Sequence, residues 1–134
     1  MADWQTADLR SIPAVGPGAD PAGWEGFAPD PAAYVAGWHG VREHFALTGF
    51  GANAATADEG GLLVVPHDEL EFGGQEELYV VVEGRARFTC DGTDVELGPG
   101  GVVACRAQVS RQAVALESPT TVLMVSGGEV PPNL

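Results

Sequence analysis

The chain has 134 residues, including 19 glycines and 10 prolines, and charged residues make up 19% of it. This composition favours one domain built from short strands and tight turns over a fold of long helices. A formal net charge of −13 argues against binding to the phosphate backbone of nucleic acids and to anionic membrane surfaces, and its simplest role is to keep the protein soluble.

The sequence also bears on the cellular compartment and on the cysteines. It has no run of 18 apolar residues, and its start, MADWQTADLR, lacks the basic and apolar regions of a signal peptide. We therefore expect a cytoplasmic protein without a membrane segment. Cys90 and Cys105 lie in apolar, strand-like stretches, and we interpret them as buried thiols. A disulfide is conceivable if their strands are neighbours, although a cytoplasmic chain normally keeps its thiols reduced.

The N-terminal region is predicted to be an extended arm. Residues 11–33 hold half of the prolines and show little hydrophobic periodicity. Trp4, Trp24 and Phe27 are large apolar side chains in a segment too short to bury them. We expect them to dock the arm on the rest of the fold or on a second subunit. Disorder of the first dozen residues is the alternative.

A short helix is predicted within residues 31–46. Asp30 followed by Pro31 is typical of a helix start. Large apolar residues then recur at spacings of three and four, as one helix face requires: Tyr34, Trp38, Val41 and Phe45. Two glycines weaken this helix by about 1 kcal/mol each, which would shorten it to one or two turns near its end. His39 and His44 lack partners at metal-ligand spacing and are interpreted as surface or packing residues.

From Thr48 onward the pattern changes to short strand-like runs separated by turns. The strongest local signal is Asp91-Gly92, a two-residue hairpin turn between alternating runs. The predicted strands lie within residues 48–57, 62–72, 77–84, 85–90, 93–97, 102–107, 112–117 and 120–127.

About eight strands with no helix among them predict an antiparallel all-β sandwich or barrel. We accordingly divide the chain into an arm with a short helix, residues 1–46, and a barrel, residues 47–134.

Residues 60–127 resemble a cupin, a member of the family of small barrels known as the double-stranded β-helix or jelly roll. The first cupin motif is a glycine, five residues, His-x-His, a short gap, a glutamate, six residues and a glycine. The matching positions here, with a glutamate in place of the second histidine, are Gly61, His67, Glu69, Glu77 and Gly84.

The second cupin motif is less well matched. It consists of a glycine, five residues, proline-x-glycine, two residues and a histidine. If Gly100 opens the motif, Arg106 replaces the proline, Gln108 the glycine and Arg111 the histidine. The fold expectation does not depend on this motif, since it rests on the strand pattern and the turns.

The resemblance implies a metal site of three imidazoles and a carboxylate at the mouth of the barrel. Such a set suits iron, manganese, nickel, copper or zinc. In this chain the candidate ligands are His67, Glu69 and Glu77, because residues two apart in a strand face the same side and a neighbouring strand can aim a third side chain at them. Arg111 would bring a positive charge to the position of a ligand, which disfavours a dication. We therefore expect no cofactor, with a divalent metal as the alternative.

The candidate residues also have simpler explanations. His67 can be explained as an ordinary histidine on an edge strand. A solvent-exposed hairpin explains most of the nearby carboxylates: Asp68, Glu69, Glu71, Glu76 and Glu77. Glu77 is the exception, because it shares strand parity with Tyr79 and Val81. An inward carboxylate needs a partner, and Arg111 is the candidate for a charge-assisted pair. The direction of Arg111 is ambiguous by parity.

Three functions remain open at this point. The first is a barrel without the usual metal site and without catalysis of its own. It binds a small molecule through His67, Glu77, Tyr79 and Arg111, or acts as a regulatory or assembly module. The second is a divalent-metal enzyme of the dioxygenase or isomerase type that uses His67, Glu69 and Glu77 as ligands. The third is a metal-free epimerase or cyclase with His67 or Glu77 as acid or base. The resemblance also implies a homodimer, with the arm or an edge strand crossing between subunits.

Overall fold

A computed structural model describes residues 3–13, 37–70 and 74–127 of the chain. Most of the expected arm lies outside these ranges, as do Trp24, Phe27, the Asp30-Pro31 helix start and Tyr34. In the part of the chain that is described, no helix has the length and apolar character needed to cross a membrane.

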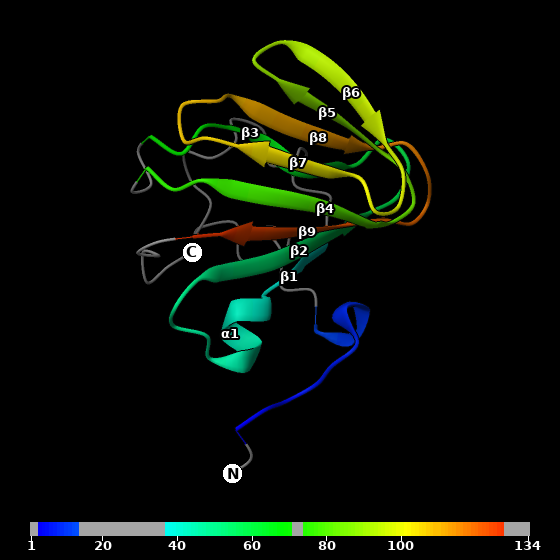
Figure 1. Cartoon of the computed structure of the whole chain (residues 1–134). Helices are drawn as coiled ribbons and strands as arrows, with labels where there is room; N and C mark the ends of the chain where they lie inside the picture. Colours follow the sequence, from blue (N-terminus) through cyan, green and yellow to red (C-terminus); the bar gives the residue numbers. More distant parts are fainter. Residues whose placement is uncertain (1–2, 14–36, 71–73, 128–134) are drawn as a thin grey trace.

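The described residues form two short helices and nine strands (Figure 1). The helices are a 3-10 turn, η1 (Leu9–Ser11), and α1 (Val41–Phe45). The strands are β1 (Gly37–His39), β2 (Gly51–Ala57), β3 (Leu62–His67), β4 (Glu77–Glu83), β5 (Ala86–Cys90), β6 (Thr93–Leu97), β7 (Val102–Cys105), β8 (Arg111–Ala115) and β9 (Thr120–Ser126).

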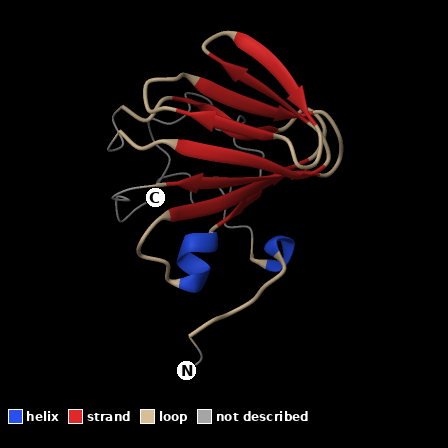
Figure 2. Cartoon of the chain, viewed as in Figure 1, coloured by secondary structure: helices blue, strands red, loops and turns tan. Residues whose placement is uncertain are grey.

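The strands make two antiparallel sheets that pack face to face (Figure 2). The first sheet has the order β1-β2-β9-β4-β7 and the second the order β3-β8-β5-β6. Inward residues of both sheets close one core, in which the Tyr79 and Phe88 rings lie 5.7 Å apart between centroids. The predicted all-β jelly roll is therefore confirmed.

Local sequence explains the turns and the edges. Asp91 and Gly92 both have positive φ, 48° and 82°, as a two-residue hairpin turn between β5 and β6 requires. Pro66 lies in β3, an edge strand of its sheet, where a missing backbone N–H does not interrupt a ladder between two neighbours. The β3–β8 register shifts on either side of Val64, so local pairing at Pro66 is irregular as well.

The predicted helix face through Trp38 is wrong. Gly37–His39 is strand β1, which pairs antiparallel with β2, and α1 begins only at Val41. The strand is favoured over the helix because it buries His39. The ring nitrogens of His39 form hydrogen bonds with the Ile12 carbonyl at 2.7 Å and with Thr56 Oγ1 at 3.0 Å. The short helical turn that was expected near the end of this stretch is confirmed as α1.

The described start of the arm is held on the five-stranded sheet. Ile12 is buried and accepts the bond from His39, while Arg10 Nη1 lies 3.1 Å from Glu83 Oε2 at the end of β4. Helix α1 covers β2 on the same side (Figures 1 and 2). The boundary at residues 46 and 47 stays a prediction, although β1 lies before it and pairs with β2.

Candidate functional site

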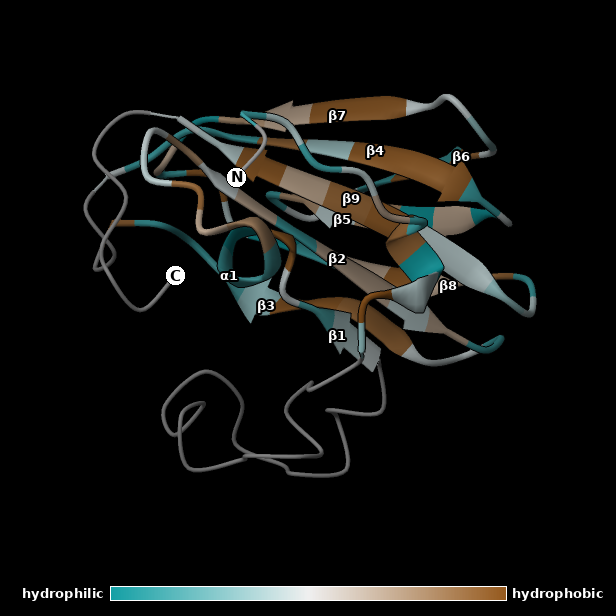
Figure 3. Cartoon of the chain, turned by 90° about the horizontal axis from the view of Figure 1, so that it is seen from below, coloured by the Kyte–Doolittle hydropathy of each residue, from teal (hydrophilic) through white to brown (hydrophobic). Residues whose placement is uncertain are grey.

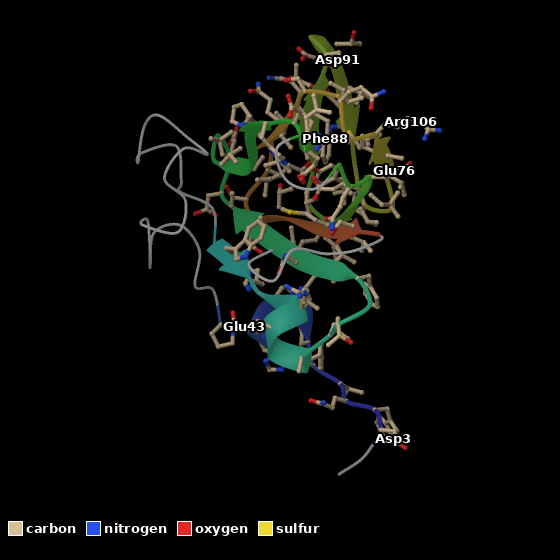
Figure 4. All side chains as sticks on the ribbon, turned by 90° about the vertical axis from the view of Figure 1, so that its left-hand side faces the viewer. Asp3, Glu43, Glu76, Phe88, Asp91 and Arg106 are labelled. Carbon is tan, nitrogen blue, oxygen red and sulfur yellow. The ribbon has the colours of Figure 1, made fainter. Side chains whose placement is uncertain are left out.

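The candidate residues meet at one end of the barrel, where β3 ends and β4 and β8 begin. His67, the last residue of β3, pairs in register with Arg111, the first residue of β8. Glu77 opens β4 in the facing sheet and pairs with Cys105, the last residue of β7. Figure 4 views the molecule from this end, with Glu76 and Arg106 close together at its rim. These two exposed side chains form an ion pair of 3.3 Å.

Glu69 joins this group from a loop and not, as the parity argument assumed, from a strand. Its backbone N–H donates to the Ala107 carbonyl at 2.9 Å, which fixes the turn after β3. Its carboxylate is buried and lies 2.9 Å from Nε2 of His67. The expectation that His67 and Glu69 point together is confirmed, but a loop contact produces it.

Arg111 points inward, which resolves the ambiguity in its direction. Its side chain has 0% exposure. Nη1 lies 3.3 Å from Glu77 Oε1 and 3.6 Å from Glu69 Oε1, and Nη2 donates to the Arg106 carbonyl at 2.7 Å. The predicted Glu77–Arg111 pair is confirmed. Nε of Arg111 has no hydrogen-bond partner among the described residues.

Tyr79 supports the cluster from within β4. It is buried, and its hydroxyl donates a 2.8 Å hydrogen bond to Glu77 Oε1. Burial raises the pKa of Tyr79 well above its usual value, with a further contribution from the Glu77 charge, so this hydroxyl remains a donor at neutral pH. Because Tyr79 is buried and bonds to Glu77, we infer that it orients the Glu77 carboxylate more than it contacts a ligand.

His67 is held as an imidazolium. Nδ1 lies 2.7 Å from the Val65 carbonyl, which can only accept, so Nδ1 carries a proton. Burial alone would lower the pKa of His67, but hydrogen bonds to Glu69, Glu77 and Val65 together raise it to about 9. Nε2 therefore also donates, to Glu69 at 2.9 Å, and it lies 3.5 Å from Glu77.

The two carboxyl groups differ in charge state. Burial would raise the pKa of Glu77, yet hydrogen bonds with His67, Glu69 and Tyr79 lower it to about 2. Burial raises the pKa of Glu69, helped by its neighbour Glu77. Glu77 is thus the ionised member of the pair, and Glu69 is the one that takes up a proton first.

The geometry permits a test of the implied metal site. His67, Glu69 and Glu77 each offer a ligand atom, and these atoms all lie within 4.8 Å of one another. By spacing alone they are close enough to hold an ion. They do not fit the three-imidazole set, because Arg111 replaces a histidine and its Nη1 approaches the same Oε1 atoms that an ion would use.

Sequence reasoning missed the two cysteines at this site. Cys105 is the register partner of Glu77 in the β4–β7 pair, and Cys90 is the register partner of Arg111 in the β5–β8 pair. The Sγ atoms of the two cysteines are 3.9 Å apart. Burial, then the nearby Cys90, raises the pKa of the Cys105 thiol to about 11. The available signal was the alignment of both cysteines with site residues, which requires the strand register and therefore the fold.

Comparison with solved structures decides the fold family. A cupin protein from Bacteroides fragilis superposes with a TM-score of 0.62 at 19% identity, over 100% of this chain and 90% of that one. A sugar phosphate isomerase of the cupin superfamily from Silicibacter pomeroyi gives 0.71 at 22% identity, over 92% and 76%. An RmlC-like cupin protein from Desulfovibrio desulfuricans gives 0.54 at 21% identity, over 60% and 74%.

The chain has the cupin fold. No model of a protein family matches the sequence, and a search of curated proteins finds no match. The cupin likeness at these identities shows the fold alone, so the activity has to be argued from the cluster around Arg111.

Proposed function

We propose that this cupin-fold chain is a small-molecule-binding barrel whose site operates without a transition metal. The observation that carries the proposal is the buried guanidinium of Arg111, whose Nη1 lies 3.3 Å from Glu77 Oε1 and 3.6 Å from Glu69 Oε1. A dication bound to the same oxygens would lie about 4 Å from a fixed positive charge, which costs several kcal/mol. Arg111 thus supplies the positive charge that would otherwise come from a metal ion.

The chemistry of the reachable groups points to a polyhydroxylated ligand such as a sugar. His67 and Glu77 keep partly exposed side chains, 16% and 14%, whereas Arg111 is fully buried. The Glu77 carboxylate offers acceptor lone pairs, and the Nε2–H of His67, which donates to Glu69 in the structure, can donate instead to a ligand oxygen. This combination matches hydroxyl groups, which both donate and accept. The positive charges of His67 and Arg111 largely offset the negative charge of the carboxylates, so a strongly charged ligand is not required. The likeness to the S. pomeroyi sugar phosphate isomerase supports testing sugars and sugar phosphates first.

Elemental analysis tests the metal-free part of the proposal. Protein dialysed against Zn²⁺, Mn²⁺ or Fe²⁺ and then desalted should retain less than about a tenth of an equivalent of metal. Arg111→His removes the guanidinium and provides a second imidazole, so this variant should retain close to one equivalent of Zn²⁺. Stoichiometric metal in the wild-type protein would contradict the proposal.

Thermal shift with a panel of sugars, sugar acids and sugar phosphates tests binding. At least one compound should raise Tm of the wild-type protein. His67→Gln should abolish that shift, while Arg87→Gln, at an exposed position on β5, should keep it. A panel without any shift, or a shift equally large in His67→Gln, would count against a ligand at this site.

A divalent-metal enzyme of the dioxygenase or isomerase type is the second candidate. The spacing of the His67, Glu69 and Glu77 ligand atoms favours it. It predicts that His67→Ala loses both metal content and activity, and an unchanged metal content would eliminate it.

A metal-free acid–base enzyme is favoured by the unequal proton affinities of Glu69 and Glu77. It would turn over its ligand in the presence of a chelator.

A further inference from the structure

Cys90 and Cys105 meet across the barrel and not along one sheet. Cys90 ends β5 in the four-stranded sheet, Cys105 ends β7 in the five-stranded sheet, and their Sγ atoms lie 3.9 Å apart. Strands β5 and β7 belong to different sheets, so the two cysteines are neighbours across the core and not within one sheet. Both thiols are free in the structure.

The positions of the two residues allow the remaining approach. A disulfide has an S–S distance of about 2 Å, so the sulfur atoms must move closer by roughly the same amount. Each cysteine is the last residue of its strand, and each strand leads into a turn or loop. Strand β7 is also an edge strand, paired on one side only. Such ends shift more easily than the middle of a paired strand.

The two cysteines connect the two halves of the site. Cys90 is the register partner of Arg111, and Cys105 is the register partner of Glu77. A covalent bond between the sulfur atoms would therefore join the strand that neighbours Arg111 to the strand that neighbours Glu77. It would tie the two sheets together at the end of the barrel where the ionic cluster lies.

We propose that Cys90 and Cys105 form a reversible inter-sheet disulfide when the protein meets a hydroperoxide. Cys105 is buried with 3% exposure and Cys90 is only partly buried, so the oxidant reaches Cys90 first. The Cys90 thiolate attacks one peroxide oxygen, the O–O bond breaks, and a sulfenic acid and hydroxide form. The Cys105 sulfur then attacks the Cys90 sulfur and displaces the hydroxyl group. With hydrogen peroxide, two thiols and one peroxide give one disulfide and two waters.

Intact-mass analysis of the full chain tests this inference. Reduced protein is treated with hydrogen peroxide and then unfolded in denaturant, in which the remaining thiols, including the otherwise buried Cys105, are alkylated with iodoacetamide. The expected product is a monomer lighter by two hydrogens, with neither cysteine alkylated, and dithiothreitol should restore two alkylatable thiols. Cys90→Ser is the matched control, and its Cys105 should remain alkylatable after the same treatment.

Thermal unfolding supplies an independent measurement. A disulfide that closes a loop of about 15 residues should raise Tm by about 5 °C or more, and reduction should reverse the shift. Cys90→Ser should show no such shift. The inference is overturned if oxidation yields a disulfide-linked dimer of two chains, yields oxygen adducts with Cys105 still alkylatable, or leaves both thiols free. It does not depend on the proposed ligand, because neither measurement uses one.

Discussion

Arg111 occupies a position that determines the charge of the whole site. Its side chain has 0% exposure, and its nearest acidic partners are Glu77 and Glu69, with a third contact to the Arg106 carbonyl. A buried guanidinium is tolerated because carboxylate and carbonyl oxygens compensate for its lost hydration. Beside this guanidinium, hydrogen bonds from His67, Glu69 and Tyr79 lower the pKa of Glu77, and hydrogen bonds to Glu69 and Glu77 raise the pKa of His67.

Stability should therefore depend on pH through His67 and Glu77. The pKa of His67 is raised from 6.5 to about 9, so its contribution is complete below pH 6.5 and is lost between pH 6.5 and 9. The pKa of Glu77 is lowered from 4.5 to about 2, so its contribution is present above pH 4.5 and is lost as the pH falls toward 2. We expect the free energy of unfolding to be highest near pH 5 to 6.5 and to fall by up to about 3 kcal/mol by pH 9.

Urea unfolding followed by circular dichroism across this pH range measures the effect. His67→Gln removes the titrating ring, so its unfolding free energy should stay nearly flat between pH 6.5 and 9. Parallel pH profiles for the wild type and the variant would show that His67 does not carry the dependence.

At the scale of the elements, the tight connection between β4 and β5 requires a glycine at position 84. Gly84 has φ +77°, and a Cβ there would overlap the Thr120 hydroxyl and lie 2.5 Å from the Pro119 carbonyl oxygen. Arg85 N–H also bonds to Thr120 Oγ1 at 3.2 Å, so the approach of the two loops is fixed. The glycine at the end of the first cupin motif thus serves packing at the barrel end opposite the site.

Gly84→Ala should destabilise the protein by between about 2 and 5 kcal/mol, because a left-handed backbone and steric overlap add together. Gly92→Ala is the matched control. Gly92 has a similar φ of +82° with no atom within 4 Å of the added Cβ, so its cost should be about 1 kcal/mol. The midpoints of urea unfolding compare the two variants, and equal losses would refute the importance of the contact.

On the scale of the whole molecule, strands β4 and β7 of the five-stranded sheet consist largely of hydrophobic residues, as the brown ribbons in Figure 3 show. Leu78 and Val82 on β4 are 39% and 44% exposed, and Val102 on β7 is 52% exposed. Strand β7 is also the edge of its sheet. Adjacent exposed apolar side chains beside an unpaired edge are typical of a subunit interface.

We accordingly expect a homodimer that uses this face. Because the chain carries a net charge of −13, the dimer fraction should increase with salt as repulsion is screened. Size-exclusion chromatography with light scattering measures it. Val102→Asp should give a monomer, whereas Val95→Asp, at a 42% exposed position on β6 of the other sheet, should leave the dimer intact. A wild-type monomer at every salt concentration would contradict the expectation.

The sequence by itself determined the class of fold and part of the site. Alternating apolar runs and the Asp91-Gly92 turn predicted the jelly roll, since strand periodicity and turn conformation are local properties. Strand parity placed Glu77 inside the barrel, and the rule that a buried carboxylate needs a partner identified Arg111.

Tertiary structure alone decided the rest. Strand β1 replaced the expected helix face because pairing with β2 and the buried bonds of His39 outweighed local periodicity. Arg111 faces inward together with Ala113 and Ala115, because the small residues of β8, and not the larger Val114, pack against the core, a choice that alternation alone does not make. Cys90 and Cys105 meet only because two sheets pack face to face, and contacts between sheets leave no periodic signal in the sequence.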